Sequence, residues 1–247
     1  MKLTIFGGTG STGICLLEQA VAAGHEVTAV VRDPHRLAGA HFLADQDHHT
    51  SQDHHASQDH HAGTDRQAGL DGGMAPEPRQ LRIVTADVMD PAMISPAVAG
   101  ADAVLSAIGP RGNGPTTVSQ DSVRSIIQAM QKSGVRRLLT VSGSVVTDAG
   151  EGPLMRYLAK PLVRRTALRH VCADMRRAEE EVRESGLDWT IMRPPRLTGK
   201  AATGKYRTAL DRNLPRGYTI SRADLAGCMV TLLADAATVH KHVGIAN

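Results

Sequence analysis

A short glycine-rich segment, GGTGSTG, separates an apolar run from a stretch whose apolar residues recur with helical spacing. The run Leu3–Phe6 predicts a strand, and Ile14–Ala23 predicts a helix that ends at Gly24. The β-branched run Val27–Val31 predicts a second strand. Two strands joined by a helix in this way form a parallel pair with a right-handed crossover. This N-terminal pattern therefore restricts the chain to α/β folds.

The alternation of strands and helices continues along the chain. Further strands are predicted at Leu81–Thr85, Ala103–Ala107, Arg137–Val141 and Trp189–Met192, with a short edge strand at Val243–Ile245. Helices are predicted at Val118–Ser133, Thr166–Ser185 and Arg222–Ala234, the last with Ser221 as its N-cap. With 247 residues, the chain is long enough for one buried core. The predicted fold is a single α/β domain with a doubly wound, mostly parallel sheet, the Rossmann fold.

Residues 41–80 are the exception to this pattern. Three copies of a six-residue unit, QDHHTS, QDHHAS and QDHHAG, occupy Gln46 to Gly63. Because the segment has almost no apolar residues, we expect a solvated, disordered insertion after the second strand. Asp-His-His triplets carry ligands that suit zinc, nickel or copper, but a low-complexity expansion is favoured because no fixed framework holds them. No catalytic metal is expected.

The glycine spacing indicates a site for a dinucleotide. Gly7 permits a tight turn, Gly10 lets the backbone approach a pyrophosphate, and Gly13 lets the helix pack closely on the strand. The N-terminus of the following helix then presents free N–H groups and a favourable dipole to the anion. Since the motif lies between a predicted strand and a predicted helix, its context supports this interpretation.

The end of the second strand indicates which dinucleotide is preferred. Enzymes specific for NAD usually place an acid there, whereas this chain has Arg32, with Arg36 four residues later. A guanidinium can pair with a 2′-phosphate, which favours NADP(H), although the adjacent Asp33 is an acid that could serve NAD instead. Asp87 and Val88 follow the third strand and could meet the adenine edge. The alternative for Asp87 is that it caps the next helix.

Six segments occur in an order that resembles atypical short-chain dehydrogenase/reductase proteins of the NmrA-like and flavin reductase (biliverdin reductase B)-like type. They are GGTGSTG, VVRDPHRL, TADVMDP, SAIGP, LLTVSGS and SGLDWTIMRPPRLTG, and they span nearly the whole chain apart from the His-rich insertion. The resemblance implies that NADP(H) crosses the carboxyl ends of the strands, at Gly7, Thr9, Gly10, Ser11, Thr12, Gly13, Arg32, Asp87, Ala107, Ile108, Gly109, Ser142 and Pro195. It further implies that the segment containing Pro194, Pro195 and Leu197 flanks the nicotinamide.

The chain departs from this family pattern at the proton donor. Members with the common dehydrogenase mechanism use Tyr-x-x-x-Lys on a helix, where the lysine lowers the pKa of the phenol. The nearest candidates, Tyr157 and Lys160, are only three residues apart, and the predicted helix Thr166–Ser185 contains no tyrosine. A conjugated acceptor needs less help from an acid than a ketone does, because it delocalises charge and solvent can protonate it.

These observations lead to two hypotheses about function. The first is an NADPH-dependent oxidoreductase that passes hydride to a flavin, a quinone or a similar small conjugated acceptor. Its candidate catalytic residues are Ser142 and Ser144, which end the fifth strand, and Tyr157; the two serines could instead be ordinary turn residues. The second is a non-enzymatic, redox-sensing regulator of the NmrA-like type that binds NADP(H).

Composition bears on partners and location. The formal net charge is only +3, and the basic run around Arg164 to Arg177 is followed by acidic residues, so no nucleic-acid partner is expected. Three cysteines, Cys15, Cys172 and Cys228, are odd in number and lack CxxC spacing, which is typical of free thiols in a reducing compartment. The first apolar run is too short for a leader or a membrane span. We therefore expect a cytoplasmic monomer or homodimer.

Overall fold

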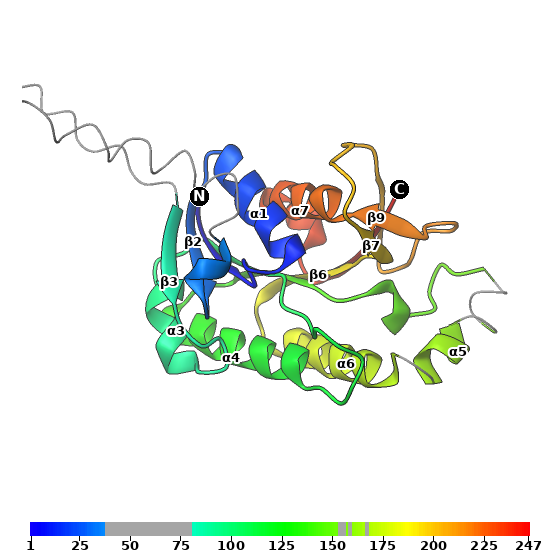
Figure 1. Cartoon of the computed structure of the whole chain (residues 1–247), viewed down its shortest axis with the longest axis horizontal. Coiled ribbons are helices and arrows are strands. Elements are labelled where there is room, and N and C mark those ends of the chain that lie inside the picture. The colour runs from blue at the N-terminus through cyan, green and yellow to red at the C-terminus, as the bar shows by residue number, and fades with distance from the viewer. Residues whose placement is uncertain (38–80, 153–156, 158–159, 166–167) are drawn as a thin grey trace, which may run out of the picture.

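The computed structural model (Figure 1) describes residues 1–37, 81–152, 157, 160–165 and 168–247. An eight-stranded sheet runs through these residues in the order β3-β2-β1-β4-β5-β6-β10-β8. In this spatial order the strands are Leu81–Thr85, Glu26–Val31, Lys2–Phe6, Ala103–Ser106, Arg137–Val141, Asp188–Arg193, Lys241–Ala246 and Arg207–Leu210. All neighbours pair in parallel except β8, which is antiparallel to β10. A separate parallel pair contains β7 (Arg196–Thr198) and β9 (Thr219–Ser221).

Helices cover both faces of the sheet (Figure 1). Helices α1 (Ser11–Ala22) and α7 (Arg222–Thr231) pack together on one face. The other face carries α3 (Pro91–Val98), α4 (Val118–Ser133) and α6 (Arg169–Glu184), and the short helix α5 (Lys160–Arg165) contacts α6. The prediction of a doubly wound, mostly parallel α/β sheet is confirmed.

The side chains of β1 point alternately to the two faces of the sheet, and each face has its own hydrophobic cluster. Leu3 and Ile5 of β1 belong to the cluster under α1 and α7. Phe6 belongs to the cluster under α3 and α4. Because successive side chains of a strand point to opposite faces, one five-residue strand anchors both helical layers.

The direction of the chain through the sheet reverses beside β1. Strand β1 pairs with β2 on one side and with β4 on the other, and the chain continues outward from each. The connections that leave the carboxyl ends of β1 and β4 therefore turn to opposite faces. In open α/β sheets a crevice forms at this point and holds the ligand.

The prediction of an edge strand at Val243–Ile245 is wrong. These residues belong to β10, which lies inside the sheet between β6 and β8. Strand β8, with the sequence RTAL and mostly exposed residues, supplies the edge instead. Strand β8 has no apolar run that would reveal it in the sequence. Without β8, β10 would be the last strand of the sheet.

Two helices also differ from the predictions. Helix α3 was expected only as the helix that Asp87 could cap, and no range was predicted for it. Pro91 occupies its first turn, and the Asp90 carboxylate accepts the N–H groups of Ala92 and Met93. The cap of this helix is therefore Asp90 and not Asp87. The helix predicted from residue 166 begins, within the described residues, at Arg169, and a separate helix α5 precedes it. The predicted insertion at 41–80 lies outside the described residues.

Candidate cofactor-binding site

The turn between β1 and α1 can be built only with glycine at two positions. Gly7 has φ +82°, and a Cβ there would lie 2.9 Å from the carbonyl carbon of Ala107 on the neighbouring chain segment. A Cβ on Gly13 would lie 2.0 Å from the carbonyl oxygen of Gly7. The absence of side chains therefore brings the start of α1 directly over the end of β1, as the spacing of the motif predicts.

The N-terminus of α1 has the properties of an anion site. Its N-cap is Gly10, whose carbonyl accepts the first intrahelical bond from the Ile14 N–H at 2.9 Å. The N–H groups of the three preceding residues, Ser11, Thr12 and Gly13, therefore have no acceptor within the helix. Since its first turn contains no acidic residue, the positive end of the helix dipole is not neutralised there.

An open cleft adjoins this helix start and brings together eight of the residues predicted to bind cofactor. They come from the carboxyl ends of β1, β2, β3 and β4: Gly7, Thr9, Gly10, Arg32, Val88, Ala107, Ile108 and Gly109. Five further residues that sequence reasoning missed complete the lining: Val30, Val31, Ala86, Met89 and Arg111. The cleft therefore lies at the reversal beside β1, where the fold predicts a ligand.

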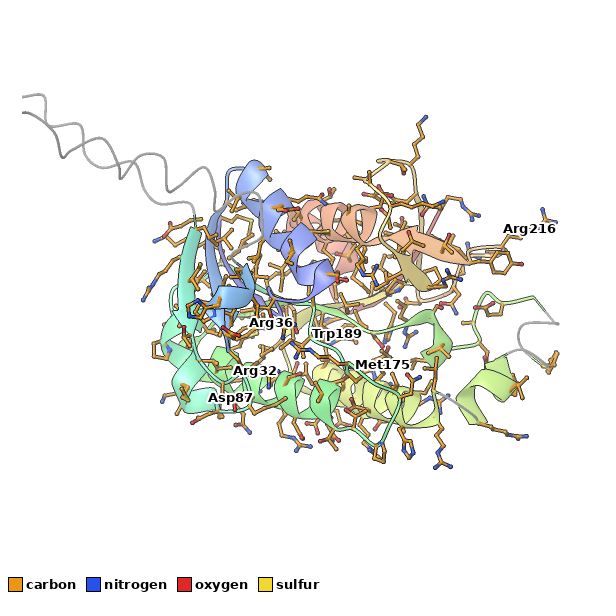
Figure 2. The ribbon with its side chains drawn as sticks, in the orientation of Figure 1. Arg32, Arg36, Asp87, Met175, Trp189 and Arg216 are labelled. Carbon is orange, nitrogen blue, oxygen red and sulfur yellow. The ribbon has the colours of Figure 1, made fainter. Side chains whose placement is uncertain are left out.

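Two arginines line the cleft. Arg32 directly follows β2, and Arg111 follows β4 after a short glycine-containing turn. The Asp33 carboxylate, the acid that could have served NAD, accepts the backbone N–H of His35 at 3.1 Å. Arg36 is exposed in the 3₁₀ turn Pro34–Leu37 and is not among the residues that line the cleft. Figure 2 shows Arg32 and Arg36 toward the same end of the molecule.

Asp87 shapes the segment after β3. Its carboxylate accepts the Met89 N–H at 3.2 Å, and its carbonyl accepts the Asp90 N–H at 3.1 Å. This side chain closes a turn, and the following Val88 is the residue that contributes to the cleft wall. Asp87 itself is not among the lining residues, and it lies toward the same end of the molecule as Arg32 in Figure 2.

A second, smaller cavity lies beyond the cleft, at the ends of β4, β5 and β6 and between α4 and α6. Ile108 lines both hollows, so they meet at that residue. The polar lining consists of Ser106, Ser119, Ser122, Thr140, Ser142 and Glu179. Its volume of about 20 Å³ is enough for one water molecule. The Ser142 hydroxyl is buried here and has no hydrogen-bond partner among the described residues.

Helix α6 presents a thioether to this cavity. Met175 lines the cavity, and its Sδ lies 3.5 Å from the position that a Cβ on Gly143 would take. Figure 2 shows Met175 above α6. One turn further along the helix, the buried Glu179 also lines the cavity. It forms a bidentate ion pair with Arg193, at 3.0 Å from Nε and 2.5 Å from Nη2.

Of the remaining predicted residues, only Ser142 lines this cavity. The Ser142 N–H donates to the Met192 carbonyl and the Ser144 N–H to the Pro194 carbonyl, both at 2.8 Å. These bonds join the segment after β5 to the segment after β6. Pro195 follows directly, and Leu197 in β7 packs against the core under α1. Tyr157 is 71% exposed, and neither hollow includes it.

The sheet order, the glycine turn and the cleft together define a dinucleotide-binding protein of the Rossmann type. The family model described as NAD(P)H-binding matches residues 7–62 and 71–236. The chain therefore belongs to this NAD(P)H-binding family. This membership confirms the NAD(P)H-binding family that the motifs indicated, and it is consistent with their resemblance to atypical short-chain dehydrogenase/reductase proteins.

The chain is also similar to a curated relative and to solved structures. The UPF0659 protein YMR090W of Saccharomyces cerevisiae is 30% identical over 165 residues, which cover 62% of this chain and 66% of the yeast protein. The oxidoreductase ylbE from Lactococcus lactis is 19% identical with a TM-score of 0.71, covering 100% of this chain and 91% of its own. At such identity the likeness shows the fold alone.

Two further solved structures have names that bear on ligands. A short-chain dehydrogenase/reductase from Veillonella parvula, in complex with NADP, is 16% identical with a TM-score of 0.70 and covers 100% of this chain and 94% of its own. ChuY, an anaerobilin reductase from Escherichia coli O157:H7, is 21% identical with a TM-score of 0.66 and covers 100% and 97%. In the described part of this chain, no helix is both long and apolar enough to cross a membrane.

Proposed function

We propose that the protein is an NADPH-dependent reductase that passes hydride to a small conjugated acceptor such as a flavin or a quinone. The observation that carries this proposal is the cavity beyond the cleft, where the unpartnered Ser142 hydroxyl lies among residues of β5 and α6 and the helix presents Met175. The cavity could offer an acceptor beside it a hydrogen bond through the one water molecule that it has room for, and the described residues that line it include no phenol.

Arg32 supports the preference for NADPH. It is an exposed cation on the cleft wall, directly after β2, where a 2′-phosphate on the adenine-side ribose would lie in this fold. The acid beside it, Asp33, already accepts a backbone N–H within its own turn. Arg111 adds a second cation to the same cleft. A doubly negative phosphate is therefore better matched here than a pair of ribose hydroxyls.

Different residues along the cleft and the small cavity would bind the cofactor and the acceptor. The start of α1 would hold the pyrophosphate, and the cleft residues would hold the adenosine half. When bound, the reduced nicotinamide supplies a hydride. The Ser142 hydroxyl would orient the acceptor beside it through a hydrogen bond, while Met175 and Ile108 would exclude water from the reacting face. That one fold neighbour is named a reductase and another an oxidoreductase agrees with this proposal.

A second candidate is a regulator that binds NADP(H) without turnover. It is favoured by the position of Met175 on α6, because a thioether cannot donate a proton and its place beside the cavity suits binding as well as catalysis. Such a protein would bind the cofactor tightly. Its affinity for a partner protein would differ between the NADP⁺-bound and NADPH-bound forms.

NADPH oxidation separates the two functions. Purified protein is first shown by calorimetry to bind NADPH, and the nicotinamide absorbance is then followed with a panel of flavins, quinones and small carbonyl compounds. We expect turnover with flavins or quinones and little with simple ketones. A Ser142→Ala variant should lower kcat more than it weakens the binding of NADPH. Tight binding without oxidation by any acceptor would contradict the reductase and favour the regulator.

A further inference from the structure

Three titratable side chains form a row that leads away from the small cavity. Glu179 lines the cavity, and its Oε2 lies 3.7 Å from Nε2 of His242. The other ring nitrogen of His242, Nδ1, lies 3.5 Å from Oδ1 of Asp211. The three residues come from α6, β10 and the turn after β8, so only the folded chain brings them together.

Exposure rises along the row from the cavity to the surface. The side chain of Glu179 is 5% exposed, that of His242 is 15% exposed and that of Asp211 is 49% exposed. The inner nitrogen of His242 is buried and has no hydrogen-bond partner among the described residues. The imidazole therefore lies between a carboxylate inside the protein and a carboxylate in contact with water.

Neighbouring groups hold the row in place. Arg193 pairs with Glu179 from β6, and Lys241 pairs with Asp211 at 3.1 Å. The His242 backbone N–H donates to Asp211 Oδ1 at 3.1 Å. The ring of His242 packs edge-on against Trp189, with 5.2 Å between ring centroids. Each carboxylate is thus fixed by a separate cation, and the imidazole lies between the two carboxylates.

We propose that Asp211, His242 and Glu179 form a proton relay that connects bulk water to the cavity beside Ser142. The relay rests on the proposed reductase function, which it extends by naming the source of the proton. An acceptor that gains a hydride becomes an anion and needs one proton to complete its reduction. The cavity lies next to Ser142 and has room for one water molecule, which would bridge Glu179 and the acceptor.

The transfers balance as a chain of single-proton steps. Before hydride transfer, Glu179 is a carboxylate paired with Arg193 and His242 is neutral. Nδ1 of His242 takes a proton from water through Asp211, and Nε2 releases its proton to Glu179, which passes it to the bridging water or the Ser142 hydroxyl. That oxygen gives a proton to the acceptor anion, and the imidazole then returns to its starting tautomer. The net change is one hydride and one proton added to the acceptor, with every residue returned to its starting state.

The surroundings of His242 suit a group that carries a proton only briefly. Burial and the charge of Arg193 lower the pKa of His242, whereas Glu179 and Asp211 oppose this by raising it. At neutral pH the ring is therefore neutral and can accept a proton at one nitrogen and release one at the other. The histidine would be a positioning and transfer group, because it does not itself line the cavity.

The first test needs no turnover. The ring nitrogens of ¹⁵N-labelled histidine are titrated by NMR in the full-length wild type, in Asp211→Asn and in Glu179→Gln. Each substitution removes a negative charge that raises the pKa of His242, and should therefore lower that pKa. Glu179→Gln leaves Arg193 buried without its partner, which can impair folding. Asp211 is at the exposed end of the row, so the Asp211→Asn variant should fold and can be titrated in either case. An unchanged His242 titration in Asp211→Asn would overturn the relay.

The second test uses a matched pair of histidine variants. His242→Gln should lower kcat with a flavin or quinone on the order of 100-fold, leave the KM for NADPH unchanged, and raise the solvent deuterium isotope effect on kcat. His240→Gln is the control, since His240 also packs on Trp189 but bonds the Leu187 carbonyl and not Glu179. Equal kcat values and isotope effects in the two variants would refute the relay.

The two tests separate failure of the relay from failure of the reductase function. Wild-type protein that binds NADPH but oxidises it with no acceptor contradicts the reductase, and the NMR titration still decides whether the three groups share a proton. Normal turnover in His242→Gln contradicts the relay and leaves the reductase function intact.

Discussion

Arg32 is the residue on which the preference for NADPH depends. Replacing it with alanine should weaken NADPH binding by about 10- to 100-fold, because a charge-assisted pair with phosphate contributes about 1.5–3 kcal/mol. NADH lacks the 2′-phosphate, so its affinity should change little. Calorimetric titration of both cofactors measures the difference.

Arg36→Ala is the control for this prediction. Arg36 carries the same charge four residues away but does not line the cleft, so its loss should affect NADPH binding much less. Equal losses of NADPH and NADH affinity in Arg32→Ala would mean that this arginine does not contact a 2′-phosphate.

The close packing at Gly13 leads to a prediction about both the stability of the fold and the binding of the cofactor. A methyl group there would lie 2.0 Å from the Gly7 carbonyl oxygen, which is backbone and cannot swing aside. Gly13→Ala should therefore lower the free energy of unfolding by about 1–3 kcal/mol and displace α1 from the pyrophosphate site. Urea unfolding compares it with Gly112→Ala, a position with no atom within 4 Å, which should be nearly neutral. A fully stable Gly13→Ala protein would contradict the packing argument.

At the scale of single residues, the sequence predicts what local geometry dictates. The roles of Gly7 and Gly13 follow from their spacing, because a strand, a tight turn and a helix leave no room for side chains there. Arg111 was missed, since its place in the cleft depends on the course of a loop that no local pattern encodes. Its position soon after the buried strand β4, within the glycine-rich segment GPRGNG, is the signal that could have found it.

Helix α4 depends on a cap from another helix. The Asp174 carboxylate on α6 is fully buried and accepts the N–H groups of Ser119 and Gln120, at 2.9 Å and 3.0 Å. Asp174→Ala should lower the free energy of unfolding by about 1–2 kcal/mol, as loss of an N-cap does. Chemical denaturation measures the loss, with Glu184→Ala on an exposed position of α6 as the control. No difference between the two variants would show that the cap is dispensable.

At the scale of elements, long periodic segments were predicted well and short ones were not. Helix α4 and strands β3 and β5 have the predicted bounds, and the Ser221 hydroxyl caps α7 by accepting the Asp224 N–H. Strands β7, β8 and β9 have three or four residues each and were missed. Their pairing depends on partners distant in the sequence, and their composition carries no apolar run.

The whole molecule should lose stability in mild acid because of His242. Its pKa is lowered in the folded state, mainly by burial, whereas the unfolded chain keeps the ordinary value near 6.5. As pH falls below 6.5, the unfolded chain binds more protons than the folded one, so stability decreases until the folded-state pKa is passed. Urea midpoints at pH 7.5 and 5.5 should differ less in His242→Gln than in wild type.

His25 should also contribute to the loss of stability in acid. Burial and the N-terminal amine lower its pKa as well, so some acid sensitivity should persist in the His242→Gln variant. Identical pH dependence in wild type and His242→Gln would show that His242 is not titrated differently on folding.

The interior position of β10 has a consequence for how the protein is made. Strand β6 ends at residue 193 and receives β10 as its second neighbour only after residues 194–240 have been synthesised. At about 5–20 residues per second, this leaves an incomplete sheet on the ribosome for roughly 2–10 seconds. During this interval β6 presents an unpaired edge, to which strands of other chains could add. Slow translation through this stretch would lengthen that exposure, so early binding by a chaperone would matter most there.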